Sequence, residues 1–305
     1  MISYLNNSEI DKDRWDECVN SSNVGVPYAL SWYLDLASPN WDALVLNNYD
    51  AVMPLPNRRK MGVRYLYSPI MCQQLGVFSK YNSESFIVND FIGAIPSKFK
   101  WIEINLNKTN SVKLAFSGMH VSEKTNHVLK LNKSYEQIFS HYNKSHIKNI
   151  FRAKKNGISI LVDSLTVSEF FDLKMKSFSK QNVFLKQYQK DNYYNLLNTL
   201  GKKGYLKIYT AYSDFEIVGS AVFIVIDNWC TLQSFNTSKG KILSAGYLIV
   251  DRFINDHSSS GLTLDFMGSN IKGIAFHNLG FGSAEDKYLF IKISKLPWWL
   301  NFIKK

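Results

Sequence analysis

The chain has 305 residues, enough for about two domains of ordinary size that each bury a core. Hydrophobic residues make up 46% of it and charged residues 20%, with 20 Phe and 17 Tyr, which excludes an intrinsically disordered, collagen-like or coiled-coil protein. The formal net charge is +11, so an anionic partner such as nucleic acid, a nucleotide phosphate or a membrane surface has to be considered.

The first part of the chain, residues 1–125, alternates short apolar runs with amphipathic segments. Apolar residues at every second position predict strands, and apolar residues three and four apart predict helices. The expected strands are 2–5, 42–47, 50–56, 65–67 and 101–106, and the expected helices are 11–20, 28–37 and 83–92.

The second part, residues 126–305, has clearer start and stop signals. Ser134 and Gln137 have the spacing of a capping box, and so do Thr166 and Glu169. Gly157 follows a basic amphipathic segment and is typical of a left-handed helix end. The expected helices are 134–142, 143–156, 166–180, 191–200, 244–257 and 270–279, and the expected strands are 158–162, 205–212, 217–226, 229–235, 262–266 and 287–293.

The order of these elements predicts the fold class. From residue 158 it is β-α-α-β-β-β-α-β-α-β, and residues 1–125 show a looser version of the same order. We therefore predict an α/β protein with mixed sheets, built from two related domains in tandem, 1–125 and 126–305.

The excess of basic over acidic residues lies entirely in the second of these domains. Residues 1–125 contain 12 basic and 12 acidic side chains, whereas residues 126–305 contain 24 basic and 13 acidic ones. The segment 126–155 alone has seven cations and one carboxylate. A phosphate-bearing ligand is therefore expected on the second domain, and no broad DNA-binding surface is expected.

Cysteine usage and hydropathy predict the compartment. Cys18, Cys72 and Cys230 are odd in number and far apart, so neither a disulfide framework nor a metal site is expected. The segment 1–7 lacks the basic and apolar regions of a signal peptide. The longest apolar run, 217–226, is shorter than the roughly 20 residues of a membrane span. These features favour a cytoplasmic protein without a transmembrane segment.

Several short motifs carry a resemblance to a known family. They are Ser31–Asp35, Met53–Pro56 with Arg58–Lys60, Gln73–Gly76, the basic segment Tyr142–Gly157 with Tyr135 before it, Leu264–Ser269 and Gly280–Ser283. Together with the element order, they resemble the GNAT acyltransferase fold and the FemAB-like proteins of bacterial origin, in which two GNAT-type domains share one chain. The resemblance implies two tandem GNAT-like (acyl-CoA N-acyltransferase) domains, with the first on the acceptor side and the second on the donor side.

The resemblance also implies a loop for the pyrophosphate of coenzyme A, leading into a helix N-terminus. GNAT proteins carry Gln/Arg-x-x-Gly-x-Gly/Ala there; the aligned segment here is 241–246, and only its last position matches outright. Acyl-CoA is therefore expected as a co-substrate and not as a tightly bound cofactor. The alternative is a solvated basic turn that begins an ordinary helix. The residues predicted to contact the donor are Lys239, Gly240, Lys241, Ser244 and Gly246.

A row of basic residues recurs at intervals of three and four: His141, Lys144, Lys148, Arg152 and Lys155. In a continuous helix they share one face. The row is either a solvated surface or the wall of a channel for an anionic substrate, including the tRNA that FemAB-type aminoacyl transferases use. Lys148 and Arg152 are the predicted substrate contacts.

Other candidates follow from the resemblance. Arg58, Gln73 and Gln74 are predicted acceptor contacts, although a hairpin cap and buried loop amides explain them equally well. Asp265 is a candidate base for the attacking amine and Tyr288 a candidate acid for the leaving thiolate. The alternatives are a carboxylate that caps the turn after it, and a strand residue that packs in the core.

The function expected from these features is acyl transfer from an acyl-CoA-type thioester to an amine of a small molecule or cell-envelope precursor. Two alternatives stay open: aminoacyl transfer from tRNA to a peptidoglycan peptide, and a catalytically inactive binding protein of the same fold. The aromatic and basic segment 296–305 either touches a membrane surface weakly or docks onto the first domain.

Overall fold

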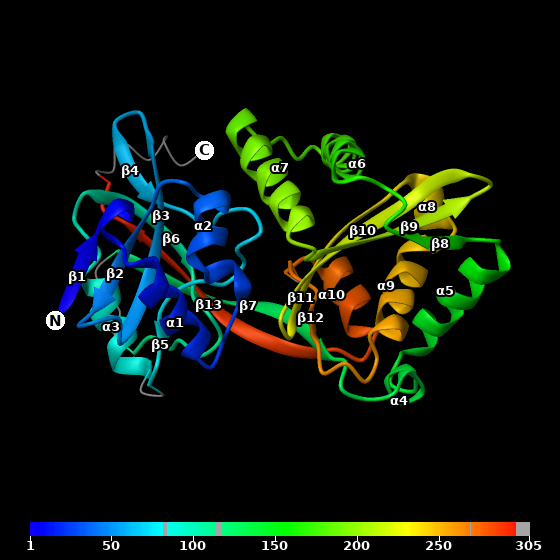
Figure 1. Ribbon diagram of the computed structural model, residues 1–305, viewed down its shortest axis with the longest axis horizontal. Coiled ribbons are helices and arrows are strands. Elements are labelled where there is room, and N and C mark those ends of the chain that lie inside the picture. Colours follow the sequence, from blue (N-terminus) through cyan, green and yellow to red (C-terminus); the bar gives the residue numbers. More distant parts are fainter. Residues whose placement is uncertain (82–83, 114–117, 269, 297–305) are drawn as a thin grey trace. The chain divides into compact units, whose positions relative to one another are not determined.

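The computed structural model describes residues 1–81, 84–113, 118–268 and 270–296. By its contacts the chain divides into two units (Figure 1). Unit 1 consists of Met1–Lys124 together with the chain from Lys287 onward, and unit 2 consists of Thr125–Asp286. Most of the segment 296–305, for which a membrane contact or docking onto the first domain was predicted, lies outside the described residues, since 297–305 are not described.

Unit 1 is a mixed sheet with helices, and its strands run in the order β1-β2-β3-β4-β6-β13. Neighbouring strands are antiparallel except β4 and β6, which are parallel. Its core contains Phe91, Phe99 and Ile102. The strands are β1 (Ile2–Leu5), β2 (Trp41–Leu46), β3 (Ala51–Lys60), β4 (Val63–Leu66), β5 (Phe78–Ser79), β6 (Phe99–Asn105) and β13 (Ala284–Ser294), and the helices are α1 (Lys12–Ser21), α2 (Ser31–Ala37) and α3 (Glu84–Gly93).

Unit 2 has a sheet in the order β7-β12-β11-β10-β9-β8, with β11 and β12 parallel and the other neighbours antiparallel. Its strands are β7 (Met119–Lys130), β8 (Ser159–Val162), β9 (Leu206–Ser213), β10 (Glu216–Ile226), β11 (Trp229–Asn236) and β12 (Thr263–Asp265). Its helices are α4 (Tyr135–Phe139), α5 (Lys144–Lys155), α6 (Val167–Lys180), α7 (Gln187–Lys202), α8 (Ser238–Ile242), α9 (Ala245–Asp256) and α10 (Lys272–Leu279).

The two sheets have the same order and directions of strands. In each unit, the last strand comes from a part of the chain that follows the other unit in the sequence. In each, four strands are antiparallel neighbours, the fourth and fifth are parallel, and the sixth is antiparallel to the fifth. The sixth strand of unit 2 is the end of β7, where Val128–Lys130 follow unit 1 in the sequence and pair with β12. The sixth strand of unit 1 is the end of β13, where Phe290–Ser294 follow unit 2 and pair with β6. The prediction of related tandem folds is confirmed.

The last strand of the chain, β13, belongs to a different unit from the one that the sequence-based division at residue 125 gave it. That division gave residues 126–305 to one domain, whereas Phe290–Ser294 pair with Trp101–Asn105 of unit 1. The strand β7 was not predicted, because polar residues on both of its faces hide the period of two: its sequence is MHVSEKTNHVLK.

Most local predictions hold. Both capping boxes form, and Gly157 has a φ of +69° at the end of α5. The helices expected at 134–142 and 143–156 are separate, since α4 ends at Phe139 and α5 starts at Lys144. His141 therefore lies between them, and the row of basic residues is not on one continuous helix. The segment between β11 and α9, for which no helix was predicted, contains the short helix α8.

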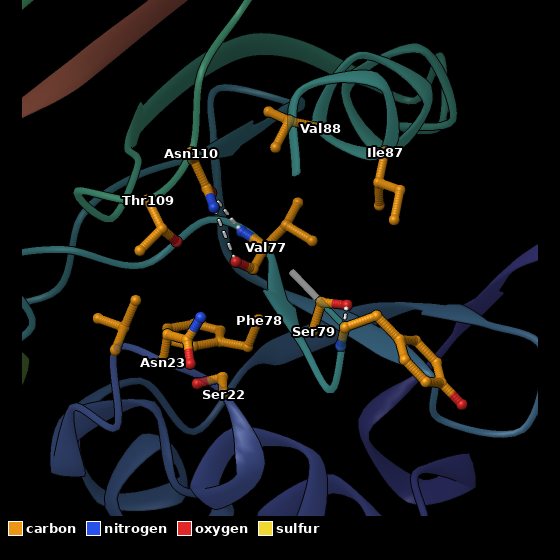
Figure 2. A pocket seen from close by; sticks show the side chains of 11 residues that line it. Ser22, Asn23, Val77, Phe78, Ser79, Ile87, Val88, Thr109 and Asn110 are labelled. Carbon is orange, nitrogen blue, oxygen red and sulfur yellow. Dashed lines mark hydrogen bonds between the residues drawn. The ribbon is translucent and has the colours of Figure 1, made fainter. Parts of the chain in front are cut away.

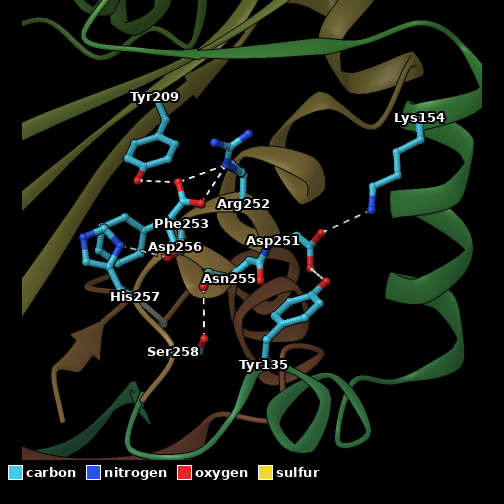
Figure 3. A network of polar contacts seen from close by, with 10 residues as sticks. All are labelled: Tyr135, Lys154, Tyr209, Asp251, Arg252, Phe253, Asn255, Asp256, His257 and Ser258. Carbon is cyan, nitrogen blue, oxygen red and sulfur yellow. Dashed lines mark hydrogen bonds and ion pairs between the residues drawn. The ribbon is translucent and has the colours of Figure 1, made fainter. Parts of the chain in front are cut away.

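The helix α9 lies against one face of the unit 2 sheet, where Phe253 stacks on Phe223 with ring centroids 3.7 Å apart. Polar contacts fix the helix further (Figure 3). The carboxylate of Asp251 is buried and accepts a hydrogen bond from the hydroxyl of Tyr135 at 2.8 Å. Burial raises the pKa of Asp251 above its usual value. The second half of α9 is therefore held against the sheet and next to α4.

Candidate functional site

The parallel pair β11 and β12 diverges after three residue pairs. Trp229–Thr231 pair with Thr263–Asp265, and β12 then ends while β11 continues to Asn236. Residues 232–236 pair with β10 on one side only. The opposite side of these residues, which has no strand partner among the described parts of the chain, is here called the open edge.

The register shows which backbone groups point to the open edge. Asn228 O accepts a hydrogen bond from Thr263 N, so this carbonyl points toward β12. Thr237 N instead donates to Val218 O of β10. Backbone groups alternate in direction along a strand, so the carbonyl of Ser234, six residues after Asn228, points to the open edge.

The ammonium of Lys174 occupies this position. Lys174 belongs to α6, which packs on the sheet face opposite α9 through contact of Phe170 with Phe235. Its Nζ donates a hydrogen bond to Ser234 O at 2.5 Å and lies 4.7 Å from the ring centroid of Phe178. Only 7% of the residue is exposed. Burial lowers the pKa of Lys174 to about 8.

Lys174 was missed in the sequence, although a signal exists. Phe170, Lys174 and Phe178 lie four residues apart, so one helix face consists of two aromatic residues and a lysine between them. When such a helix face packs against a sheet, the lysine between the two aromatic residues is buried with them. Because buried lysines are rare, this pattern marks Lys174 as unusual.

The residues predicted to bind the donor phosphates lie in α8 and in the turn to α9. Lys239 makes an ion pair with Glu216 at 2.8 Å. Gly240 packs directly on β10, since a Cβ there would lie 1.9 Å from Val218 O. Ser244 has a φ of +63° and its hydroxyl donates to Asn149 Oδ1 at 3.0 Å. Three of the five residues therefore have structural contacts of their own.

The other two remain accessible to a ligand. Lys241 is exposed at the end of α8. Gly246 is in the first turn of α9, and its missing side chain leaves room for the amide of Asn236, which would lie 2.7 Å from a Cβ. The Asn236 Oδ1 atom is buried and has no hydrogen-bond partner among the described residues. The N-terminus of α9 adds the positive end of a helix dipole.

Asp265, the predicted base, is completely buried at the end of β12. Its Oδ1 accepts hydrogen bonds from Asn126 Nδ2 at 2.7 Å and from Met267 N at 2.9 Å. The second bond is the turn-capping contact that was considered as the alternative role. The carboxylate therefore links β7, β12 and the turn that follows.

Four predicted residues belong to unit 1. Tyr288 is a buried residue of β13, in the part of that strand that belongs to unit 1. The guanidinium of Arg58 lies 4.5 Å from the ring centroid of Tyr67. Gln74 is buried, whereas Gln73 is partly exposed. The structure places these residues within unit 1 and the donor-side candidates within unit 2.

The helix α5 presents a cationic face to solvent. Lys144, Lys148, Arg152 and Lys155 are all exposed. Within the described ranges, none of the four makes an ion pair with a carboxylate. Phe151, on the same helix, is 60% exposed. The helix therefore combines cations with an accessible aromatic ring.

Figure 2 shows a hollow in unit 1, and its lining residues among those that the structure describes are all uncharged. Asn110 accepts a hydrogen bond from Val77 N at 2.7 Å and donates one to Val77 O at 2.9 Å, so its amide acts as a backbone anchor.

No helix in the described part of the chain is long and apolar enough to cross a bilayer.

Comparison with known proteins finds a family match within unit 2. Residues 143–273 match the family model described as an acetyltransferase (GNAT) domain. The matched segment contains α6, β11, β12 and the start of α9, and so includes the open edge. No curated protein sequence matches the chain.

Solved structures extend the likeness over the whole chain. FemX has a TM-score of 0.64 at 10% identity, covering 99% of this chain and 100% of FemX. A tandem GNAT protein from the clavulanic acid biosynthesis pathway has a TM-score of 0.58 at 12% identity, with 97% and 99% covered. The C-terminal domain of a putative lysylphosphatidylglycerol synthetase from Agrobacterium fabrum has a TM-score of 0.57 at 9% identity, with 98% and 95% covered. These structures share the tandem fold.

Proposed function

Because residues 143–273 match a GNAT acetyltransferase domain and the chain has the tandem fold of FemX, we propose that it is an N-acyltransferase with an acyl-CoA-type thioester as donor. The acceptor is an amine of a small molecule or of a cell-envelope precursor. The open edge of β11 carries this proposal, because in the GNAT fold that this chain resembles the strand of Asp265 splays next to the donor thioester, and here β12, which ends at Asp265, leaves β11 after three residue pairs. The buried ammonium of Lys174 lies on this edge and supports the proposal.

Donor binding in this proposal uses Lys241 and the N-terminus of α9. The exposed ammonium attracts a phosphate, and the first amide groups of α9 donate to it along the helix dipole. Lys241 lacks the planar fork of arginine, so it acts as a point charge. Arg58, Gln73 and Gln74 remain predicted contacts of the acceptor.

Acetyl-CoA is expected to raise the melting temperature of the protein by several degrees at millimolar concentration, because a ligand that binds only the folded state stabilises it. Lys241→Ala should shift the binding curve to about tenfold higher acetyl-CoA, the cost of one phosphate contact of ~1.4 kcal/mol. Lys202→Ala removes an exposed lysine at the end of α7 and is the matched control. The donor assignment fails if acetyl-CoA and longer acyl-CoA thioesters leave the melting temperature unchanged.

A second candidate is aminoacyl transfer from tRNA, and the cationic face of α5 favours it. Filter binding of charged tRNA should weaken steeply with salt, and Lys148→Ala and Arg152→Ala should each reduce the slope of log K against log salt by about 1. Phe151→Ala should weaken binding without changing that slope, because a stacking contact releases no counterions. Weak binding that does not depend on salt contradicts this candidate.

A further inference from the structure

Lys174 is a buried cation that the fold does not neutralise. Its Nζ donates to one neutral carbonyl, Ser234 O, and no carboxylate pairs with it among the described residues. Burial is the cause of its lowered pKa, without a charged neighbour that contributes. A buried ammonium without an anionic partner lowers the stability of the folded protein. Such a cost is typical of residues that serve a function.

The neighbourhood of Lys174 leaves its charge unopposed. On α6 itself Asp172 and Lys176 are exposed. On β11 the contacting residues Ser234 and Phe235 do not titrate. On α7, which packs against α6, Tyr193 is buried and its pKa is raised by burial, so it stays neutral. At neutral pH the protonation of Lys174 is therefore set by its own burial and by any group that binds at the open edge.

The other proton-transfer candidates are less suited to the open edge. Both bonds that Asp265 Oδ1 accepts hold it in a structural role, and the residue has no exposed surface. Tyr288 is a buried residue of the strand β13. Gln233, on β11, has its amide 3.9 Å from Met267 Sδ and does not titrate. Lys174 is thus the titratable side chain that the described structure places on the open edge.

We propose that Lys174 is the proton carrier of the acyl transfer at the open edge, an assignment that rests on the proposed function. The acceptor nitrogen forms a bond with the acyl carbon of the thioester, and the neutral amine of Lys174 takes the proton that this nitrogen loses. The bond between the acyl carbon and sulfur breaks, and the thiolate leaves. The Lys174 ammonium then gives its proton to the thiolate, which restores the neutral amine.

Neutral and charged Lys174 both have a defined position in this cycle. The hydrogen bond to Ser234 O keeps Nζ on the edge in either state, since the amine and the ammonium are both donors. A pKa of about 8 leaves both states accessible near neutral pH, which is the condition for efficient general acid-base catalysis.

The test measures thiol release from acetyl-CoA with primary amines as acceptors: an amino sugar, free lysine and a short lysine-containing peptide. Lys174→Met should lower the rate at least 100-fold and leave acetyl-CoA binding, followed by thermal shift, within threefold of wild type. Lys174→Arg should not restore the rate, because arginine keeps the charge but does not release its proton. Lys176→Met, on the exposed face of α6, is the matched control and should keep the wild-type rate.

The pH profile adds an independent readout. The wild-type rate should show an inflection near pH 8 that is absent from both Lys174 variants, whereas the inflection of the acceptor amine remains. A folded Lys174→Met variant with the wild-type rate overturns the assignment and leaves the proposed function standing. Absence of both acetyl-CoA binding and thiol release overturns the proposed function, and the assignment with it.

Discussion

Replacing Ile291 with alanine is expected to lower the free energy of unfolding of unit 1 by about 2–5 kcal/mol, the usual cost of truncating a buried isoleucine. Ile291 is 1% exposed and belongs to the same core as Phe99 and Ile102. It pairs with Ile104 of β6, although more than half of the chain separates the two residues. The loss should therefore appear in unit 1 and not in the unit that precedes Ile291 in the sequence.

Hydrogen exchange of backbone amides locates the effect. Ile291→Ala should accelerate exchange in β1–β6 and leave β8–β12 protected, because only the unit 1 sheet loses packing. Ile249→Ala is the matched control: the residue is also 1% exposed, and it lies on α9 in unit 2. It should produce the opposite pattern. Faster exchange in β8–β12 on Ile291→Ala would contradict the assignment of β13 to unit 1.

Gly240→Ala is expected to cost about 3 kcal/mol of stability or more, because overpacking against a fixed backbone is expensive. The added Cβ would lie 1.9 Å from Val218 O and 2.8 Å from Val218 C, which are backbone atoms inside β10. Neither atom has a rotamer through which to move away. The variant should unfold at lower denaturant concentration whether or not acetyl-CoA is present.

The control for this substitution is Gly273→Ala. Gly273 lies in α10, and a Cβ there meets no atom within 4 Å, so the variant should be unchanged or gain up to about 1 kcal/mol from helix propensity. The outcome also separates the two roles of Gly240. Full stability of Gly240→Ala combined with lost acetyl-CoA binding would contradict the packing role and support a direct phosphate contact.

Local signals in the sequence were accurate where the interaction itself is local. The capping box of Thr166 and Glu169 joins residues three apart, so its spacing is readable before folding. The meander β9, β10 and β11 was also predicted, because its turns connect consecutive strands. The two helices 134–142 and 143–156 were predicted as well, but the first ends earlier than expected, at Phe139, so His141 lies outside both.

The candidate site was predicted only in part. The turn after β11 was located correctly, and the structure shows that Lys239 and Ser244 in it already have partners, Glu216 and Asn149. Those partners come from other elements, so spacing in the sequence does not reveal them. The position of Lys174 between two aromatic residues of one helix face can be seen in the sequence. Its hydrogen bond to Ser234 O cannot, because that bond depends on how α6 crosses β11.

The sequence by itself determined the tandem α/β fold and the restriction of the excess positive charge to the second part of the chain, because periodicity, caps and composition act over a few residues. Only the tertiary structure decided that β7 and β13 are exchanged between the units and that the ammonium of Lys174 lies on the open edge of β11. Contacts between distant segments determine which strands pair and which charged groups become buried. Many strand pairings are compatible with the same local pattern, and only the packing of the whole core selects one of them.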